Sequence, residues 1–140
     1  MGAPTLGLQP LGALAPEAGP DWSAPSLDRG AALADPMRYQ VVDYLRRCPL
    51  FLAWMEYTED QIDGRFQVAG GSGIQSDGVY YWRVDAADYV REYGIPIPAA
   101  ALTRIEESGG IVPSFDRDEY ARIFRELDRL VGSSAMAWRP

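Results

Sequence analysis

The sequence predicts an α+β protein in which about four helices pack on a small antiparallel sheet. Apolar residues recur at helical spacing in three stretches, and short β-prone segments bounded by Gly and Asp lie between the first and the second. The composition, 47% hydrophobic and 24% charged, is that of an ordinary globular protein. A chain of 140 residues is long enough for one domain with its own core.

The first 34 residues are expected to form an extended or disordered arm. They are rich in Gly, Pro, Ala and Ser and show no sustained hydrophobic period. Trp22 and the scattered leucines could anchor part of this arm onto the domain or onto a neighbouring chain. The sequence therefore divides into a flexible arm, residues 1–34, and a single α+β domain, residues 35–140.

The domain is predicted to open with a helix that begins at Asp35-Pro36 and stops at Pro49. Aspartate caps helix N-termini, and proline suits the first helical position. Apolar residues then recur three or four positions apart on one face: Met37, Val41, Tyr44, Leu45 and Cys48. The apolar run 50–55 that follows is short enough for a buried strand.

Turn signals divide the centre of the chain into short strands. Asp63-Gly64 indicates a hairpin, and the glycines of residues 70–73 indicate a bend or bulge. Ser76-Asp77-Gly78 predicts a second tight turn before the aromatic segment 79–82. In a strand Tyr80 and Trp82 point to one face and Tyr81 to the other. One face is expected to pack on the helices, which leaves the other face either covered by the N-terminal arm or exposed to solvent.

Three further helices are predicted in the second half. The first starts at Asp85 and ends at Gly94, and a short one covers residues 99–107. Residues 111–115 are expected to form a brief edge strand, because Pro113 argues against a central one. The last helix begins with a capping box at residues 116–119. Its apolar stripe comprises Tyr120, Ile123, Phe124, Leu127 and Val131.

The residue types that are missing argue against most kinds of catalysis. The chain has no histidine and no lysine, and all 13 basic residues are arginine. Without histidine, the chain lacks the commonest general base and the commonest metal ligand. Without lysine, it lacks the residue that binds phosphate in Walker-type loops and the residue that forms Schiff bases. We expect no enzyme, no catalytic residue, no metal site and no cofactor, although a hydrolase that works through carboxylates and arginine stays open.

The single cysteine and the short apolar runs indicate in which cellular compartment the protein is expected. Cys48 allows no intramolecular disulfide, so a reducing cytoplasm is the default expectation. Cys48 itself is expected to be a small buried hydrophobe on the apolar side of its helix. The longest apolar run, residues 50–55, is far shorter than the ~20 residues of a membrane span, so no membrane association is expected.

The net charge of −7 disfavours direct binding to nucleic acid and favours a protein partner with a basic surface. Carboxylates gather between residues 56 and 63, and aromatic residues lie near them and around residues 80–82. Exposed Tyr and Trp beside acids are typical of protein interfaces, although core packing is an equal alternative for each aromatic residue. The oligomeric state stays open. The predicted partner-binding residues are Glu56, Glu59, Asp60, Asp63, Asp77, Tyr80 and Trp82.

The segment 73–82 (GIQSDGVYYW), followed by residues 88–90 (DYV) and 94–98 (GIPIP), resembles a group of small bacterial proteins. Their signature is S/T-D-G-x-W/Y-x-W, and some of them look like immunity proteins that neutralise polymorphic toxins. The resemblance covers about 25 residues and implies an intracellular protein that binds a cognate toxin and blocks its active site. The alternative is an adaptor or structural subunit of a larger assembly, related to phage or secretion, whose arm orders on a neighbour.

Overall fold

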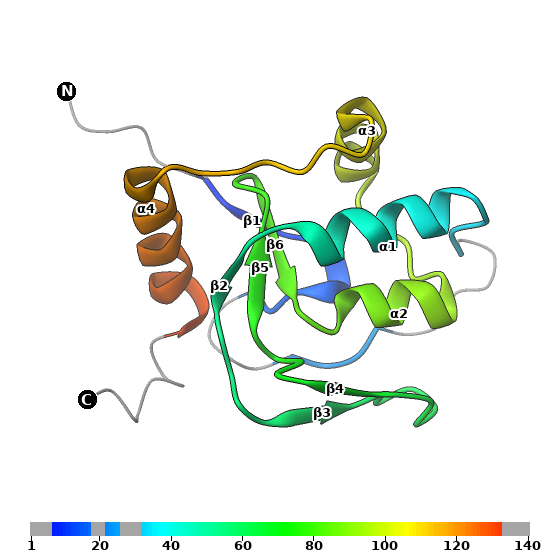
Figure 1. Cartoon of the computed structure of the whole chain (residues 1–140). Coiled ribbons are helices and arrows are strands. Elements are labelled where there is room, and N and C mark those ends of the chain that lie inside the picture. Colours follow the sequence, from blue (N-terminus) through cyan, green and yellow to red (C-terminus); the bar gives the residue numbers. More distant parts are fainter. Residues whose placement is uncertain (1–6, 18–21, 26–31, 133–140) are drawn as a thin grey trace.

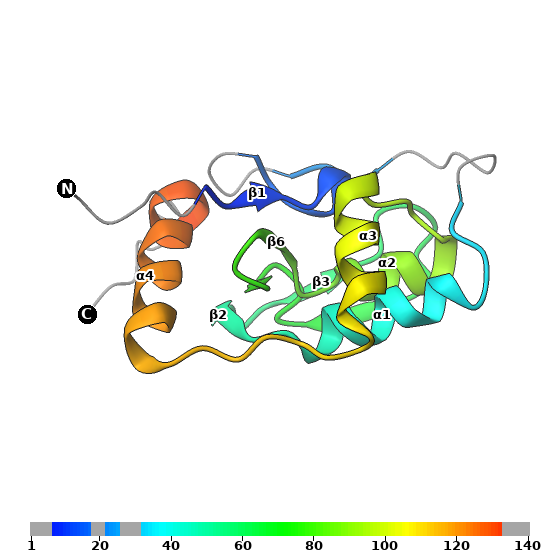
Figure 2. The same cartoon turned by 90° about the horizontal axis from the view of Figure 1, so that it is seen from above.

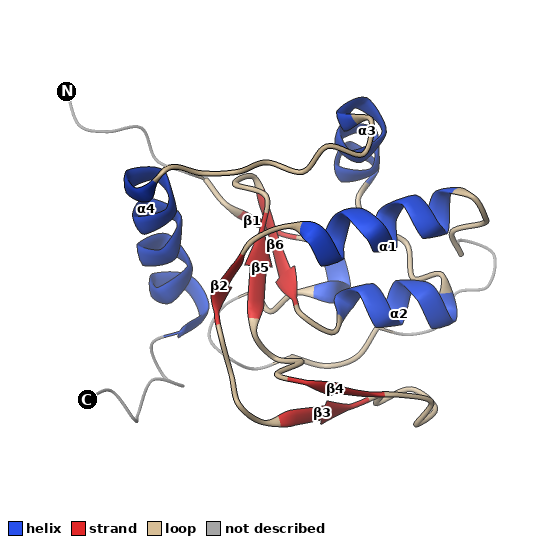
Figure 3. Cartoon of the chain, viewed as in Figure 1, coloured by secondary structure: helices blue, strands red, loops and turns tan. Residues whose placement is uncertain are grey.

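The structure, a computed structural model, describes residues 7–17, 22–25 and 32–132. Within these residues it confirms the α+β class, with four α-helices, a four-stranded sheet and a two-stranded sheet (Figures 1 and 3). The helices are α1 (Met37–Arg47), α2 (Ala86–Tyr93), α3 (Ala99–Ser108) and α4 (Arg117–Leu127). The strands are β1 (Gln9–Pro10), β2 (Leu50–Leu52), β3 (Tyr57–Glu59), β4 (Gln67–Ala69), β5 (Ile74–Ser76) and β6 (Tyr80–Arg83).

The larger sheet is mixed, whereas the sequence predicted an antiparallel one. Its strand order is β1-β6-β5-β2, and β5 pairs antiparallel with both β6 and β2. β1 runs parallel to β6, with Gln9 opposite Tyr80. The parallel pair was missed because its outer strand comes from the segment that the composition assigned to an arm. The hairpin β3–β4 is antiparallel and turns around Asp63-Gly64, as predicted.

Residues 7–17, which the composition assigned to a flexible arm, belong to the core of the domain. Leu8, Leu11 and Leu14 are buried, and a 3-10 turn spans Gly12–Leu14. The backbone N–H of Leu11 donates to the carbonyl of Tyr81 at 2.9 Å. Trp22, Ala24 and Leu33 of the predicted arm also pack against this core, whereas residues 1–6, 18–21 and 26–31 lie outside the described residues.

The sheet divides the core in two. Figures 1 and 2 show α4 on one side of the strands and α1, α2 and α3 on the other. Tyr80 and Trp82 of β6 pack with the three-helix side, and Tyr81 packs with the α4 side. The aromatic segment 80–82 is therefore core on both faces, which answers the question that the sequence left open.

The helices end where local signals predicted. Gly94 terminates α2 in the left-handed conformation, with φ of 66°, and its N–H donates to the carbonyl of Val90 at 2.8 Å. The capping box of α4 is complete, because the Asp116 side chain accepts from the Glu119 N–H and the Glu119 side chain accepts from the Asp116 N–H. A π-helical turn, Asp128–Gly132, continues α4.

Four local predictions differ from the structure. Asp35 does not cap the first helix, because α1 begins at Met37, its N-cap is Pro36, and no side-chain hydrogen bond caps it. The strand predicted for residues 111–115 is wrong, since this segment has no strand pairing. The run 50–55 is a strand only over β2, and the chain then leaves the larger sheet. In the apolar stripe of α4, Tyr120 and Phe124 are 38% and 40% exposed, although the Tyr120 ring stacks on Phe51 of β2.

We expect Leu14→Ala to lower the free energy of unfolding by about 2–5 kcal/mol, because the side chain is fully buried in the main core. Gln9→Ala is the matched control, since the Gln9 side chain is exposed on the same segment and should contribute less than about 0.5 kcal/mol. Urea denaturation measures both. Equal effects of the two substitutions would show that residues 7–17 do not stabilise the fold.

Candidate functional site

The structure separates the predicted partner-binding residues into a buried and an exposed set. Asp60, Asp77, Tyr80 and Trp82 are each at most 8% exposed. A partner cannot contact these side chains without unfolding part of the domain, so they do not form an interaction surface in this structure. Their burial follows from the position of β6 inside the sheet and from hydrogen bonds that the two carboxylates accept.

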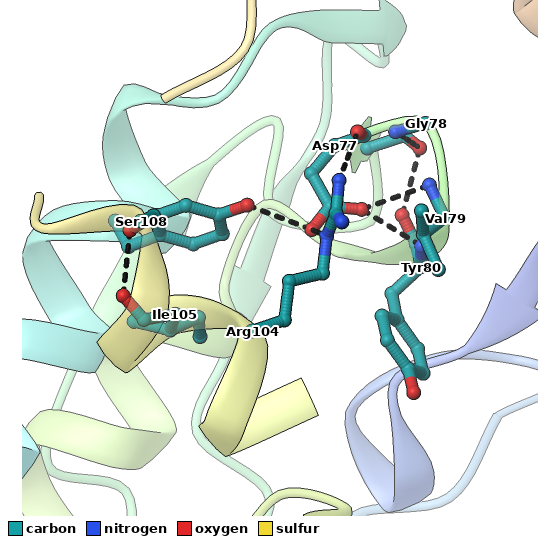
Figure 4. Close-up of polar contacts among 9 residues, drawn as sticks. Asp77, Gly78, Val79, Tyr80, Arg104, Ile105 and Ser108 are labelled. Carbon is teal, nitrogen blue, oxygen red and sulfur yellow. Dashed lines mark hydrogen bonds and ion pairs between the residues drawn. The ribbon is translucent and has the colours of Figure 1, made fainter. Parts of the chain in front are cut away.

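The Asp77 carboxylate joins three elements (Figure 4). Its Oδ1 accepts from the backbone N–H groups of Val79 and Tyr80 at 2.9 and 2.8 Å, which closes the turn between β5 and β6. Its Oδ2 accepts from the Tyr44 hydroxyl of α1 at 2.8 Å and from Arg104 Nε of α3 at 3.0 Å. Burial, followed by the charge of Asp77, raises the pKa of Tyr44 above its ordinary value. Both carboxylate oxygens are therefore engaged in structure.

A cavity of about 330 Å³ lies beside this cluster, and its wall includes Tyr44, Arg104 and Ser108. The Arg104 guanidinium already pairs with Asp77, so it does not present an uncompensated positive charge to the cavity. The nearby Cys48 is buried, and burial, with the charge of Asp77, raises the pKa of its thiol to about 12. A thiol with that pKa is not a nucleophile at neutral pH.

Asp60 has a comparable structural role in the loop of the β3–β4 hairpin. It accepts from the backbone N–H groups of Ile62 at 2.8 Å and Arg65 at 2.9 Å, and from the Tyr93 hydroxyl of α2. Burial alone raises the pKa of Asp60, but the hydrogen bonds from Tyr93, Arg65 and Ile62 together outweigh it. The net pKa therefore lies below the ordinary value.

Arg83 and Asp85 attach the hairpin to the start of α2. Arg83 binds Asp85 through two hydrogen bonds, Nε to Oδ1 at 2.9 Å and Nη2 to Oδ2 at 2.8 Å. Its guanidinium carbon lies 3.9 Å from the centroid of the Trp22 ring. Thr58 of β3 donates to Asp85 Oδ2 at 3.0 Å, which directs the Thr58 side chain inward. Gly71 permits this approach, because a Cβ atom there would overlap the Thr58 hydroxyl.

Apolar side chains are exposed where the chain crosses from β2 to β3. Met55 is 97% exposed and Tyr57 is 73% exposed. Glu56 and Glu59, two of the predicted partner-binding residues, are exposed in the same stretch. We call this stretch, residues 54–59, the β3 surface. Sequence reasoning missed Met55 because it assigned the run 50–55 to a buried strand.

An open cavity of about 610 Å³ adjoins the β3 surface. Arg83 lies in its wall, where the bidentate pair with Asp85 neutralises the guanidinium. The polar groups at the rim are Glu56 and Ser72, and the Ser72 hydroxyl donates to Glu56 Oε1 at 3.1 Å. The lining is otherwise apolar: Pro16, Leu52, Ala53, Trp54, Met55, Ile74 and Val131.

The charge of the β3 surface is negative. Within the part of the chain that the structure describes, the Glu59 side chain makes no hydrogen bond or ion pair. Asp63, the third exposed member of the predicted set, pairs with Arg65 at 3.1 Å on the exposed hairpin turn. The structure thus brings Glu56 and Glu59 together with Met55, Tyr57 and the cavity, and it places Asp63 at the far end of the same hairpin.

The described residues contain no helix long and apolar enough to cross a membrane. Among the same residues, no three His, Cys, Asp or Glu side chains gather in a way that could hold a metal ion. Comparison of the chain with protein-family models, curated proteins and solved structures finds no match. A function must therefore be inferred from the chemistry of the β3 surface and its cavity.

We expect Asp60→Asn to lower the free energy of unfolding at pH 7 by about 1–3 kcal/mol, because the amide cannot accept all the hydrogen bonds that the carboxylate accepts. The folded-state pKa of Asp60 is depressed, so its contribution is present above the unfolded pKa and is lost as the pH falls through the folded pKa. The difference from the wild type should therefore shrink in acid. Urea denaturation at pH 7 and in acid measures this difference in the free energy of unfolding. Asp63→Asn, at an exposed position, is the control.

Cys48 should react with a water-soluble aromatic disulfide reagent only after unfolding, because its thiol is buried and its pKa is raised to about 12. The absorbance of the released thiolate at pH 8 gives the rate. We expect very slow release in native buffer and rapid, stoichiometric release in denaturing urea. Rapid labelling of the folded protein would mean that the thiol is accessible.

Proposed function

We propose that this protein is a protein-binding module, most specifically an immunity-type protein of a bacterial cytoplasm that binds a cognate toxin and occludes its active site. The observation that carries the proposal is the exposure of Met55 and Tyr57 beside an open apolar cavity and among carboxylates. Protein interfaces commonly combine such aromatic and Met anchors with a polar rim.

The energetics favour a bound state for this surface. Burying a side chain of the size of Met55 or Tyr57 against a partner contributes about 1.5–3 kcal/mol relative to exposure to water. The cavity can accept a large side chain of the partner, which is the arrangement of an interface hot spot. Anchors of this kind account for most of the binding energy in known complexes, whereas rim charges contribute less.

The negative charge supports a partner with a basic surface. Glu56, Glu59 and Asp63 lie on the same hairpin or its approach, and the whole chain carries −7. Complementary charges accelerate diffusional encounter and disfavour acidic competitors. Occlusion of a basic toxin site would use the carboxylates for steering and the apolar groups for retention.

The alternatives have less support. The adaptor alternative depends on an arm that orders on a neighbour, but residues 7–17 pack into the core of their own domain. Hydrolases that work through carboxylates commonly use two of them in one site, whereas each cavity has a single carboxylate residue in its lining, Glu56 in the larger and Glu107 in the smaller. Asp77, which adjoins the smaller cavity, uses both of its oxygens to hold the turn, α1 and α3.

We expect the tagged protein to capture one stoichiometric, basic partner from its own cells, and this partner should be toxic when expressed alone. The double substitution Met55→Asp, Tyr57→Ser should weaken binding of the purified partner by about 10- to 100-fold, because it removes both exposed anchors. Size-exclusion chromatography, mass spectrometry and calorimetry measure capture and affinity.

Ile111→Ser is the matched control, since Ile111 is also exposed but lies in the segment after α3, at the opposite end of the molecule from β3 (Figure 1). It should leave the affinity within about twofold of the wild type. A multi-subunit assembly, a non-toxic partner, or equal effects of the two variants would contradict the proposal.

A further inference from the structure

The backbone of β3 specifies how a partner would bind, a question that exposed side chains alone leave open. We propose that the outer edge of β3 binds an extended, basic segment of the partner as an additional strand of the β3–β4 sheet. This inference rests on the proposed function and adds the conformation and the side-chain pattern of the bound segment.

The register of the hairpin shows which backbone groups are free. The N–H of Gly70 donates to the carbonyl of Glu56 at 2.7 Å, and the N–H of Asp60 donates to the carbonyl of Phe66 at 2.9 Å. Thr58, which pairs with Val68, lies midway between these two bonded positions. Hydrogen-bonded and non-hydrogen-bonded pairs alternate in an antiparallel ladder. The N–H and C=O groups of Tyr57 and Glu59 therefore point away from β4.

The outer edge is accessible to another strand. Of the strands formed by residues 7–17, 22–25 and 32–132, β4 is the only one that pairs with β3. Figure 1 shows β3 at the lower margin of the molecule, with β4 between it and α2. Two N–H and two C=O groups on this edge can thus bond to an added strand, which is the geometry of strand addition in peptide recognition.

The side chains of β3 define the sequence of the added strand. Thr58 points inward to Asp85, so Tyr57 and Glu59 share the opposite, exposed face. On that face, an added strand places one residue beside Glu59 and another, two positions along, beside Tyr57. Arg or Lys suits the first position and an aromatic or large aliphatic residue suits the second. An apolar residue two positions further along can contact the exposed Met55.

The charges favour this partner over a second copy of the same chain. An identical β3 strand, Tyr-Thr-Glu, contains no basic residue, so it offers no cation to Glu59, and it would bring up a second molecule of net charge −7. Opposite charges paired across a sheet stabilise it, and like charges destabilise it. Glu59, which has no partner side chain among the described residues, is best neutralised by a cation from a different protein.

The test selects ligands for the full-length protein from a phage-displayed library of random 12-residue linear peptides. We expect the enriched peptides to be basic and to alternate basic and apolar residues. Each is then synthesised in three forms: one unmodified, and two that are N-methylated at every second amide, one in each of the two alternating phases. Methylation of the amides that face β3 should weaken binding at least about tenfold, because it removes the donors to the edge of β3. Methylation of the alternate amides, which face away from β3, should not weaken binding.

Two further measurements locate the peptide. Amide hydrogen exchange should slow at Tyr57 and Glu59 in the complex, because these are the edge groups that the added strand would bond. Glu59→Arg should weaken the basic peptides about tenfold. Glu106→Arg, a charge reversal at another exposed position, on α3 at the far end of the molecule, should change the affinity less than about twofold.

The outcomes separate this inference from the proposed function. Peptides that bind regardless of N-methylation, an acidic or patternless selection, or no enrichment would overturn strand addition. If Met55→Asp, Tyr57→Ser still abolished capture of the cognate partner, the β3 surface would remain its binding site. A dimer of the free protein with slow exchange at Tyr57 and Glu59 would assign the edge to a second copy and would also overturn the inference.

Discussion

The carboxylate of Asp77 is the interaction on which the arrangement of this fold depends. The side chain is 3% exposed, and an isolated buried charge would be costly. Four donors compensate it: two backbone N–H groups of its own turn, the Tyr44 hydroxyl and the Arg104 guanidinium. Because Tyr44 belongs to α1 and Arg104 to α3, satisfying this one charge fixes both helices against the turn between β5 and β6. Removal of any donor leaves part of the charge uncompensated, which is strongly destabilising in a buried pair.

The same turn sets the environment of the aromatic residues that follow. β6 starts directly after it and lies between β5 and β1, so neither edge of β6 is free, and the packing of helices on both sides of the sheet buries both of its faces. Tyr80 and Trp82 fill the core under α1, α2 and α3, while Tyr81 fills the core under α4 and donates its hydroxyl to the carbonyl of Pro16 at 2.7 Å. The acidic turn and its aromatic neighbours, which resemble interface chemistry in the sequence, are therefore the structural centre of the domain.

Local signals predicted the elements well, and long-range pairing accounts for what was missed. Pro49, Gly94 and the capping box at Asp116 act within one helical turn, so the sequence alone placed those helix ends. The pairing of Gln9 with Tyr80 joins residues 71 positions apart, and nothing near either residue indicates it. The burial of Tyr80 depends on that pairing, so its location was not predictable from composition or alternation. Of the residues predicted to bind a partner, Glu56, Glu59 and Asp63 are exposed, whereas the exposure of Met55 follows from where β2 stops.

The protection of the strand edges explains why the free edge of the fold, and with it the proposed binding surface, lies on β3 rather than on the larger sheet. β1 is two residues long and contains Pro10, which cannot donate to a further strand. β2 is covered by α4, whose Tyr120 stacks on Phe51 with ring centroids 4.3 Å apart and donates its hydroxyl to the carbonyl of Leu50. β3 has neither protection, and its exposed Tyr57 follows an almost fully exposed Met55. An apolar open edge ordinarily invites aggregation, but the acids of this stretch repel another copy of the same acidic chain. Under the proposed function, the charge that opposes self-association is also the charge that would favour a basic partner, so one feature of the sequence would serve both solubility and recognition.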